Sequence, residues 1–240
     1  FSPIPLKNTP DLLTNNLLGE LLWQAFSLSG LLKRFEADIL LTADASSLCL
    51  FAPTVVISQD LSSFEPEVLR SAAGFVSLRL QIIKWIQVLA LRRAETCIYQ
   101  SSYAQTVINR VVRSAKESAV IAHGVGSPEP RWSPEKFLRK KPDIDKYKCL
   151  YVSPFAHYKK QLELVKAIRK CQMEGLDLSL ELIGGGDGDY TDLVLEEIAV
   201  ARQEGCDITI KGFMEHQKVL MTMSDADIFI FPSVCETFGI

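Results

Sequence analysis

The stretch Leu178-Ser-Leu-Glu-Leu-Ile-Gly-Gly-Gly-Asp-Gly188 predicts a short apolar strand that runs directly into a glycine-rich turn. The pattern continues with a helix over 190–204 and a further strand over 207–211. Strands that alternate with helices in this way are typical of βαβ units, so the stretch predicts a largely parallel sheet.

The same alternation extends over the rest of the chain. In the second half we expect strands over 148–153 and 226–231 and helices over 159–174 and 216–223. In the first half we expect strands over 37–42, 54–58, 96–99 and 118–122, and helices over 11–35, 65–93 (broken near Gly74) and 103–114. The predicted fold class is therefore α/β, with two Rossmann-like domains of parallel strands flanked by helices.

A change in amino-acid composition separates the two series of strands and helices. Residues 128–147 are rich in proline and charged side chains, which indicates a polar linker. We therefore predict an N-terminal domain over 1–127 and a C-terminal domain over 148–240, with a ligand cleft between them.

Composition narrows the class of protein. The 240 residues are 48% hydrophobic and 23% charged, as in ordinary globular proteins, and the net charge of -3 gives no case for nucleic-acid binding. Six scattered cysteines without C-x-x-C spacing argue against zinc and against a disulfide framework. We expect a cytoplasmic protein, and we expect this chain to be a piece of a longer one with both domains incomplete, because it starts without methionine and ends inside a motif.

Candidate ligand residues follow the predicted strands of the second half. Lys159 and Lys160 stand at the start of a helix, where the free helix amides favour binding of a phosphate. The alternative, which is commoner for a pair of lysines, is that both are solvated surface charges. The 184–188 glycines allow close backbone approach, or form a plain turn. Glu236, before Gly239, suits hydrogen bonding to hydroxyls. The carboxyl ends of parallel strands share one edge of the sheet, so these residues are expected to lie on one rim.

Four blocks of the second half resemble, in order and spacing, the C-terminal domain of GT-B glycosyltransferases of the retaining family 4. The blocks are Leu150-Tyr-Val-Ser-Pro-Phe-Ala-His-Tyr-Lys-Lys-Gln-Leu-Glu-Leu-Val165, Leu180-Glu-Leu-Ile-Gly-Gly-Gly186, Ile208-Thr-Ile-Lys-Gly212 and 225–240. The first half is similar to that family more loosely, at 92–103 and 120–125.

The resemblance implies roles for individual residues. Lys159 matches the lysine on the donor diphosphate, and Glu236 matches the first acid of an E-x7-E motif that meets the transferred sugar. Gly184 and Gly185 match glycines that line the nucleotide. Further donor contacts are expected at Lys160, His123, Gly124, Phe238 and Gly239.

Two positions depart from the family pattern. Pro154 stands where many members have an arginine, which removes or replaces a phosphate contact. Gln59 stands where the N-terminal domain often has a histidine, and an amide cannot act as a base.

The resemblance implies transfer of a hexose from a nucleotide-diphosphate sugar to a carbohydrate or lipid-linked acceptor, with retention. The spacing Asp225-Ala-Asp227 leads into an apolar strand, so we interpret it as structural and expect no metal and no cofactor besides the donor. Two alternatives stay open, namely a sugar-nucleotide epimerase of the same fold and a non-catalytic nucleotide- or glycan-binding protein.

The helix expected around residues 75–93 combines apolar residues with Arg79, Lys84, Arg92 and Arg93. It either packs on the sheet of its own domain or lies on an anionic membrane, which would place the protein at the inner face of that membrane.

Overall fold

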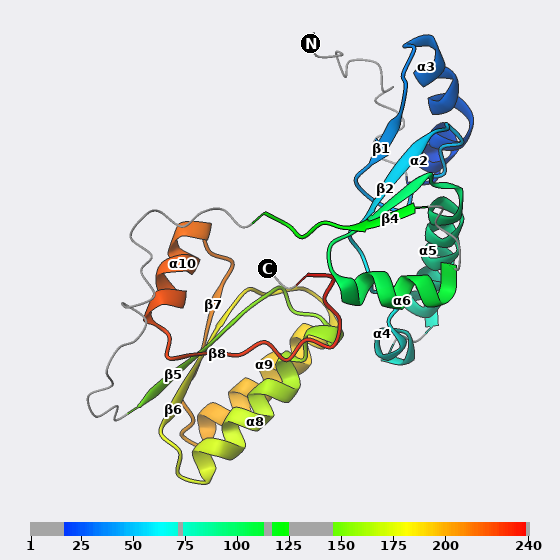
Figure 1. The fold of residues 1–240 in the computed structure, drawn as a ribbon. Helices are drawn as coiled ribbons and strands as arrows, with labels where there is room; N and C mark the ends of the chain where they lie inside the picture. The colour runs from blue at the N-terminus through cyan, green and yellow to red at the C-terminus, as the bar shows by residue number, and fades with distance from the viewer. Residues whose placement is uncertain (1–16, 72–73, 113–116, 125–145, 239–240) are drawn as a thin grey trace. The chain divides into compact units, whose positions relative to one another are not determined.

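Parallel strands flanked by helices form both halves of the protein, as the alternating pattern predicted. The computed structural model describes residues 17–71, 74–112, 117–124 and 146–238 (Figure 1). The chain divides into two compact units, one made of residues 1–125 with 236–240 and the other of residues 126–235. Each unit holds one four-stranded sheet.

In the first unit the strand order follows the chain, β1-β2-β3-β4, and every neighbouring pair is parallel. The strands are β1 (Leu40–Thr42), β2 (Thr54–Ser58), β3 (Thr96–Tyr99) and β4 (Glu117–Val120). The helices are α2 (Leu17–Trp23), a π-helical turn η1 (Gln24–Leu28), α3 (Ser29–Arg34), α4 (Pro66–Ser71), α5 (Gly74–Arg93) and α6 (Ser102–Val112). Buried side chains on β2, β3, α5 and α6, such as Val56, Cys97, Leu91 and Ile108, make the core of this unit.

Helix α5 is the longest helix of the described chain. By length and composition alone, its twenty residues are apolar enough to cross a membrane. Of the most apolar part of the helix, 22% is buried within the structure. Its last turns carry the buried residues Ile86, Gln87 and Leu91, and β3 begins three residues after Arg93. The C-terminal half of α5 is therefore a packed helix of the first unit, whereas its N-terminal half is exposed.

In the second unit the strand order is β7-β6-β5-β8, again with all neighbours parallel. The strands are β5 (Tyr147–Val152), β6 (Leu178–Ile183), β7 (Ile208–Gly212) and β8 (Ile228–Phe229). The helices are a 3-10 turn η2 (His157–Lys159), α8 (Gln161–Met173), α9 (Asp189–Gln203) and α10 (His216–Asp225).

One continuous core holds the second unit together. Alternate side chains of β5 and β6, including Tyr151 and Leu182, pack against Val165 of α8 and against Val194 and Ala201 of α9, all fully buried. Both helices thus cover the same face of the sheet, and α10 lies beside β5 (Figure 1). Burying a side chain of this size contributes about 2 kcal/mol, so this face fixes the position of the strand ends.

The structure changes several predicted boundaries. The helix expected over 11–35 is described only from Leu17. It is interrupted at Gln24–Leu28 by the π turn η1, which takes up one residue more than a regular helical turn. The strand expected over 226–231 is shorter in the structure, where β8 comprises only Ile228–Phe229 and pairs with β5. The predicted linker falls almost entirely outside the described residues, and residues 236–240, expected in the second domain, group with the first unit.

Candidate functional site

The carboxyl edge of the second sheet continues as paired loops beyond the strands. The amide of Ser153 donates to the Ile183 carbonyl over 3.0 Å, and the amide of Phe155 donates to the Gly185 carbonyl over 2.8 Å. The side chain of Gln161, fully buried, donates to the Pro154 carbonyl over 2.8 Å and accepts from the Ala156 amide over 3.4 Å. These bonds make the edge a fixed backbone surface.

Gly184 is required by this pairing. Its φ is +127°, and a Cβ built at this position would lie 2.1 Å from the carbonyl oxygen of Ser153. Its amide donates to the Gly212 carbonyl over 2.8 Å, which joins the ends of β6 and β7. No other residue type fits here, so the loop after β6 approaches its neighbours more closely than any side chain would permit.

Lys159 lies on the 3-10 turn at the same edge, two residues before α8 rather than at its first position as predicted. Its ammonium stands 5.2 Å from the ring centre of Tyr158 and 5.3 Å from that of Phe231, which follows β8. The amide of Val234 donates to the Tyr158 carbonyl over 2.9 Å. The aromatic rings and the pinned turn hold the cation at the edge of the sheet.

The first amides of α8 already have a partner. The Leu162 amide donates to the phenol oxygen of Tyr190 over 3.2 Å. Burial raises the pKa of that phenol, and the backbone hydrogen bond from Leu162 opposes the rise. The Leu162 amide is therefore already satisfied within the protein, whereas the predicted role of Lys159 towards a phosphate stays a prediction.

The turn into α9 offers a different environment. Thr191 is buried, and its Oγ1 has no hydrogen-bond partner among the described residues. It lies 3.0 Å from the position that a Cβ on Gly186 would take, so the glycine leaves room in front of the hydroxyl. The acids Asp187 and Asp189 flank this turn and are exposed. The loop therefore suits an uncharged polar ligand better than an anion.

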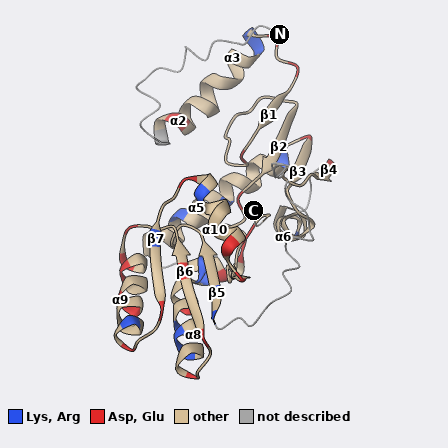
Figure 2. Cartoon of the chain, turned by 90° about the vertical axis from the view of Figure 1, so that its left-hand side faces the viewer, with Lys and Arg blue, Asp and Glu red and all other residues tan. Residues whose placement is uncertain are grey.

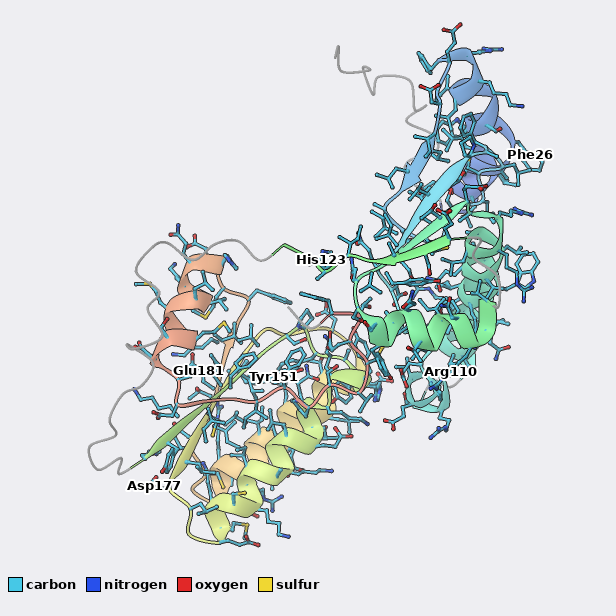
Figure 3. All side chains as sticks on the ribbon, viewed as in Figure 1. Phe26, Arg110, His123, Tyr151, Asp177 and Glu181 are labelled. Atoms are coloured by element: carbon cyan, nitrogen blue, oxygen red, sulfur yellow. The ribbon has the colours of Figure 1, made fainter. Side chains whose placement is uncertain are left out.

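In the first unit, residues 237–238 lie across the carboxyl ends of three strands. Thr237 accepts a hydrogen bond from Ser101 Oγ over 2.6 Å and donates one to the Gln59 carbonyl over 2.9 Å. Phe238 packs edge-on against His123, with ring centres 5.6 Å apart. His123 follows β4, as its label in Figure 3 shows. Thus His123 and Phe238, both predicted donor contacts, are brought together within this unit.

Two buried polar side chains at this edge were not predicted as site residues from the sequence. Ser58 ends β2 and Gln100 follows β3, and both side chains are buried. Ser58 Oγ and Gln100 Nε2 have no hydrogen-bond partner in the described part of the chain. Burying such a group unpaired costs about 1–3 kcal/mol, so both mark places where a ligand could supply a partner. Their position, at the last residue of a strand for Ser58 and directly after a strand for Gln100, is the only signal that the sequence held.

The remaining predicted residues are placed as follows. Glu236 is half-buried and belongs to the first unit, whereas Lys159 belongs to the second. Lys160 is the left-handed residue before α8 and pairs with Glu163 over 3.1 Å. Gly124 is exposed after β4, and Gly239 lies outside the described residues.

The Asp225-Ala-Asp227 spacing has a structural explanation. Asp225 ends α10, and the carboxylate of Asp227 accepts the Lys148 amide over 2.9 Å while its own amide donates to the Lys148 carbonyl. Asp227 therefore fastens β8 to β5. Within residues 17–71, 74–112, 117–124 and 146–238, no three His, Cys, Asp or Glu side chains gather as metal ligands.

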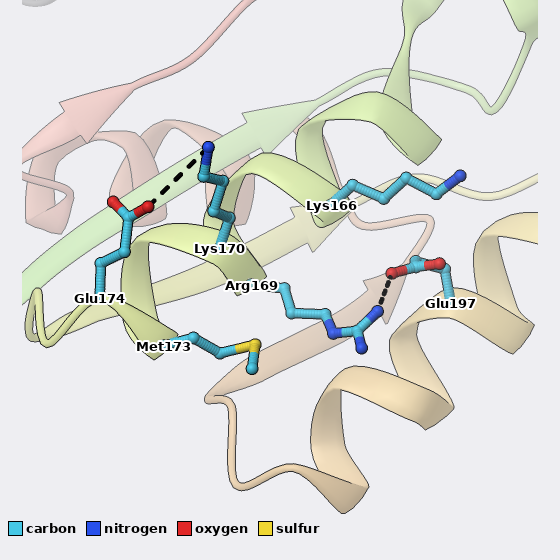
Figure 4. A pocket seen from close by; sticks show the side chains of 6 residues that line it. All are labelled: Lys166, Arg169, Lys170, Met173, Glu174 and Glu197. Atoms are coloured by element: carbon cyan, nitrogen blue, oxygen red, sulfur yellow. Dashed lines mark hydrogen bonds and ion pairs between the residues drawn. The ribbon is translucent and has the colours of Figure 1, made fainter.

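A hollow of about 380 Å³ on the outer side of α8 and α9 is not part of this edge (Figure 4). Arg169 pairs there with Glu197 over 2.9 Å and with Glu204, and Lys170 pairs with Glu174. Both signs of charge are interspersed along these helices (Figure 2). Most charges that line the hollow are paired with one another, and exposed pairs of this kind contribute at most about 1 kcal/mol each.

Comparison with known proteins identifies the fold. Residues 134–240 match the model of the family glycosyl transferases group 1. No protein of curated function matched the chain. Similar solved structures include sucrose-phosphate synthase from Thermosynechococcus elongatus, with a TM-score of 0.67, 17% identity and coverage of 100% of this chain and 60% of that one.

Two further structures share the fold. HepE of Anabaena, solved in complex with UDP and glucose, has a TM-score of 0.57 and 20% identity over 77% of this chain and 47% of its own. The lipopolysaccharide outer core galactosyltransferase WaaB has a TM-score of 0.58 and 17% identity over 90% of this chain and 55% of its own. This chain thus spans about half to three-fifths of their lengths, and the two Rossmann-like units are those of the GT-B fold.

Proposed function

We propose, from the match of residues 134–240 to glycosyl transferases group 1, that this protein transfers a hexose from a nucleotide-diphosphate sugar to a carbohydrate or lipid-linked acceptor. We propose retention of configuration and a reaction without metal or cofactor, in the cytoplasm. The observation that carries the proposal is the edge of the second sheet, where Gly184 lets the loops after β5 and β6 pair closely and Lys159 supplies a held cation.

Charge decides how the donor would lie on this edge. Lys159 and Lys160 gather on the turn before α8, whereas Asp187 and Asp189 flank the glycine turn. An anionic diphosphate is stabilised near the lysines and repelled by the acids. The uncharged nucleoside then lies on the glycine turn, where the unpaired Thr191 hydroxyl can hydrogen-bond it.

The chemistry follows from this placement. The diphosphate gains negative charge as the bond to the sugar breaks, and an ammonium held beside it stabilises that charge more in the transition state than in the ground state. Lys159 is suited to this role because its turn is fixed by Val234 and by Tyr151, whose hydroxyl donates to the Lys159 carbonyl over 3.0 Å. In this proposal Glu236 accepts hydrogen bonds from hydroxyls of the transferred sugar.

The test is calorimetric titration of the chain with nucleoside diphosphates, followed by a donor screen with acceptors. Lys159→Ala is expected to lower turnover about 100-fold, because removing one charge-stabilising donor has effects of that order. Glu236→Ala is expected to weaken donor binding. Lys170→Ala is the matched control, since this lysine of the second unit is 78% exposed on the outer side of α8.

Each outcome separates the alternatives. Full activity in both Lys159→Ala and Glu236→Ala would overturn the assignment of the site. Nucleotide binding without turnover would favour the non-catalytic alternative, and interconversion of the donor sugar without an acceptor would favour the epimerase.

A further inference from the structure

A cavity of about 320 Å³ lies in the first unit between the loop that joins β1 to β2 and the last turn of α5. The buried part of its lining is apolar and consists of Phe51, Val56 and Ala94, each at most 7% exposed. The volume is at the lower end of the usual range for small-molecule sites. The cavity therefore suits a small molecule with an apolar body.

Hydrogen bonds fix the loop that forms one wall of the cavity. The Cys49 amide donates to Ser47 Oγ over 3.2 Å, within the loop itself. The Leu48 amide donates to Gln24 Oε1 over 3.3 Å, which ties the loop to the π turn η1. The wall is thus held in place by the fold, as is usual for ligand sites that exist before a ligand binds.

Three hydroxyl groups line the cavity, and one of them lacks a partner. Ser47 accepts the Cys49 amide, and Thr54 Oγ1 donates to the Phe51 carbonyl over 2.5 Å. Thr42 Oγ1 is buried and has no hydrogen-bond partner in the ranges that the structure describes. Leaving a buried hydroxyl unpaired is unfavourable, so Thr42 marks a place where a bound molecule could supply an acceptor.

The charge of the lining favours an anion. Arg93 is the only charged side chain among the described residues that line the cavity, whereas two acids line the hollow on α8 and α9. Its guanidinium forms no ion pair within residues 17–71, 74–112, 117–124 and 146–238, while the adjacent Arg92 donates to the Val112 carbonyl over 3.2 Å. The negative end of the α5 dipole, about half a charge, opposes an anion here, but the full charge of Arg93 outweighs it.

We propose that this cavity is a binding site for a small monocarboxylate with an apolar body. A planar guanidinium such as that of Arg93 pairs with both oxygens of a carboxylate, and the Thr42 hydroxyl is a further donor. One arginine balances one negative charge, so a monoanion is favoured over a phosphate dianion. The cavity shares no described residue with the site proposed for the sugar donor, and the inference does not rest on the proposed function.

Alkylation of Cys49 by N-ethylmaleimide tests the proposal on the whole chain, because this thiol lines the cavity. Cys49 and Cys171 are partly exposed, and the other four cysteines are buried. Benzoate should slow the labelling of Cys49 with a saturable dependence on its concentration and leave the labelling of Cys171 unchanged, as mass spectrometry of the peptides measures. At neutral pH, uncharged benzyl alcohol and dianionic phenyl phosphate should each protect Cys49 about tenfold more weakly than benzoate.

Two variants examine the groups that would hold the carboxylate. Arg93→Gln should weaken protection by benzoate about tenfold, the loss expected for one charge-assisted hydrogen bond, and leave protection by benzyl alcohol unchanged. Thr42→Val should weaken protection by benzoate severalfold without lowering the Tm, because it removes a hydroxyl that has no partner in the described chain. Arg110→Gln is the matched control and should change nothing. Arg110, labelled in Figure 3, is also exposed in the last turn of a helix of the first unit but does not line the cavity.

Several results would overturn the inference. These are no saturable protection of Cys49 by benzoate, equal protection of Cys171, protection by benzyl alcohol or phenyl phosphate as strong as by benzoate, or the same behaviour of Arg93→Gln and Arg110→Gln. Because Arg93 is exposed, Arg93→Gln is expected to fold, and a thermal melt checks this. Binding of UDP measured on the same samples keeps the two proposals apart, since a chain that binds UDP but not benzoate refutes only this one.

Discussion

The two sheets have the same number of strands and the same parallel direction, yet their surroundings differ. The second sheet has one face sealed by α8 and α9, and its strand ends are locked by hydrogen bonds between loops. The first sheet has an exposed final strand, β4, and helices α2 and α3 without a buried residue among those described. The comparison teaches that two parallel sheets of four strands can differ widely in how completely neighbouring elements cover them.

Gly184→Ala should have the largest effect on this contrast. The new Cβ would overlap the Ser153 carbonyl at 2.1 Å, and the backbone has a positive φ, so we expect the second unit to lose about 3 kcal/mol of stability together with nucleotide binding. Denaturant unfolding measures the loss.

Gly185→Ala is the control, because its nearest contact would be Phe213 at an ordinary 3.6 Å. It should change stability by less than about 0.5 kcal/mol while still weakening nucleotide binding through the added methyl group. Equal stability of both variants would contradict the claim that the edge is locked by close backbone approach.

Gln161→Leu should have the next largest effect, about 2 kcal/mol, because it leaves the Ala156 amide without its partner and removes one of the two hydrogen bonds that the Pro154 carbonyl accepts. Nucleotide affinity should fall as well, since the loop that these groups belong to forms the edge. Gln172→Leu removes a comparable bond to the Leu178 carbonyl at the other end of α8. It should cost stability but leave nucleotide affinity unchanged, as titration calorimetry can verify.

Two buried serines of the first unit probe its open edge. Ser63 donates to Gln87, so Ser63→Ala should cost about 1 kcal/mol of stability. Ser58 is equally buried but has no partner in the described chain, so Ser58→Ala should leave stability unchanged or raised. If its hydroxyl meets a ligand, Ser58→Ala should weaken acceptor or donor affinity severalfold. A destabilised Ser58→Ala with normal affinity would remove this residue from the site.

The smallest effect concerns the paired charges on the outer face of α8. The hydrogen bond from Arg169 holds the pKa of Glu204 below its ordinary value of 4.5. The folded state therefore binds fewer protons than the unfolded state, and the stabilisation is complete above pH 4.5 and lost as the pH falls through the lowered pKa. Arg169→Gln should lower the Tm slightly near neutral pH, with the difference shrinking below pH 4.5. A difference that does not depend on pH would point to packing of the Arg169 side chain instead.

Much of the fold was predictable because strand and helix patterns are local. The break of the long helix near Gly74 and the bounds of β2, β3 and β6 agree with the structure to the residue or nearly so. The ends of β8 and the start of α8 were less predictable, since strand pairing with β5 and the left-handed Lys160 decide them. The roles of Lys159 and Glu236 stay predictions, and the edge residues Gln161, Ser58 and Gln100 emerged only from the structure.

The sequence by itself determined that strands and helices alternate and that glycine and lysine stand at strand ends, because spacing along the chain encodes both. Only the tertiary structure decided which polar groups at these strand and helix ends already have a hydrogen-bond partner within the protein. The Leu162 amide at the start of α8 is bonded to Tyr190, twenty-eight residues away, whereas Thr191 and Thr42 keep buried hydroxyls without partners among the described residues. Satisfaction of a polar group depends on neighbours that are distant in sequence, and so does the cavity between α5 and the loop before β2.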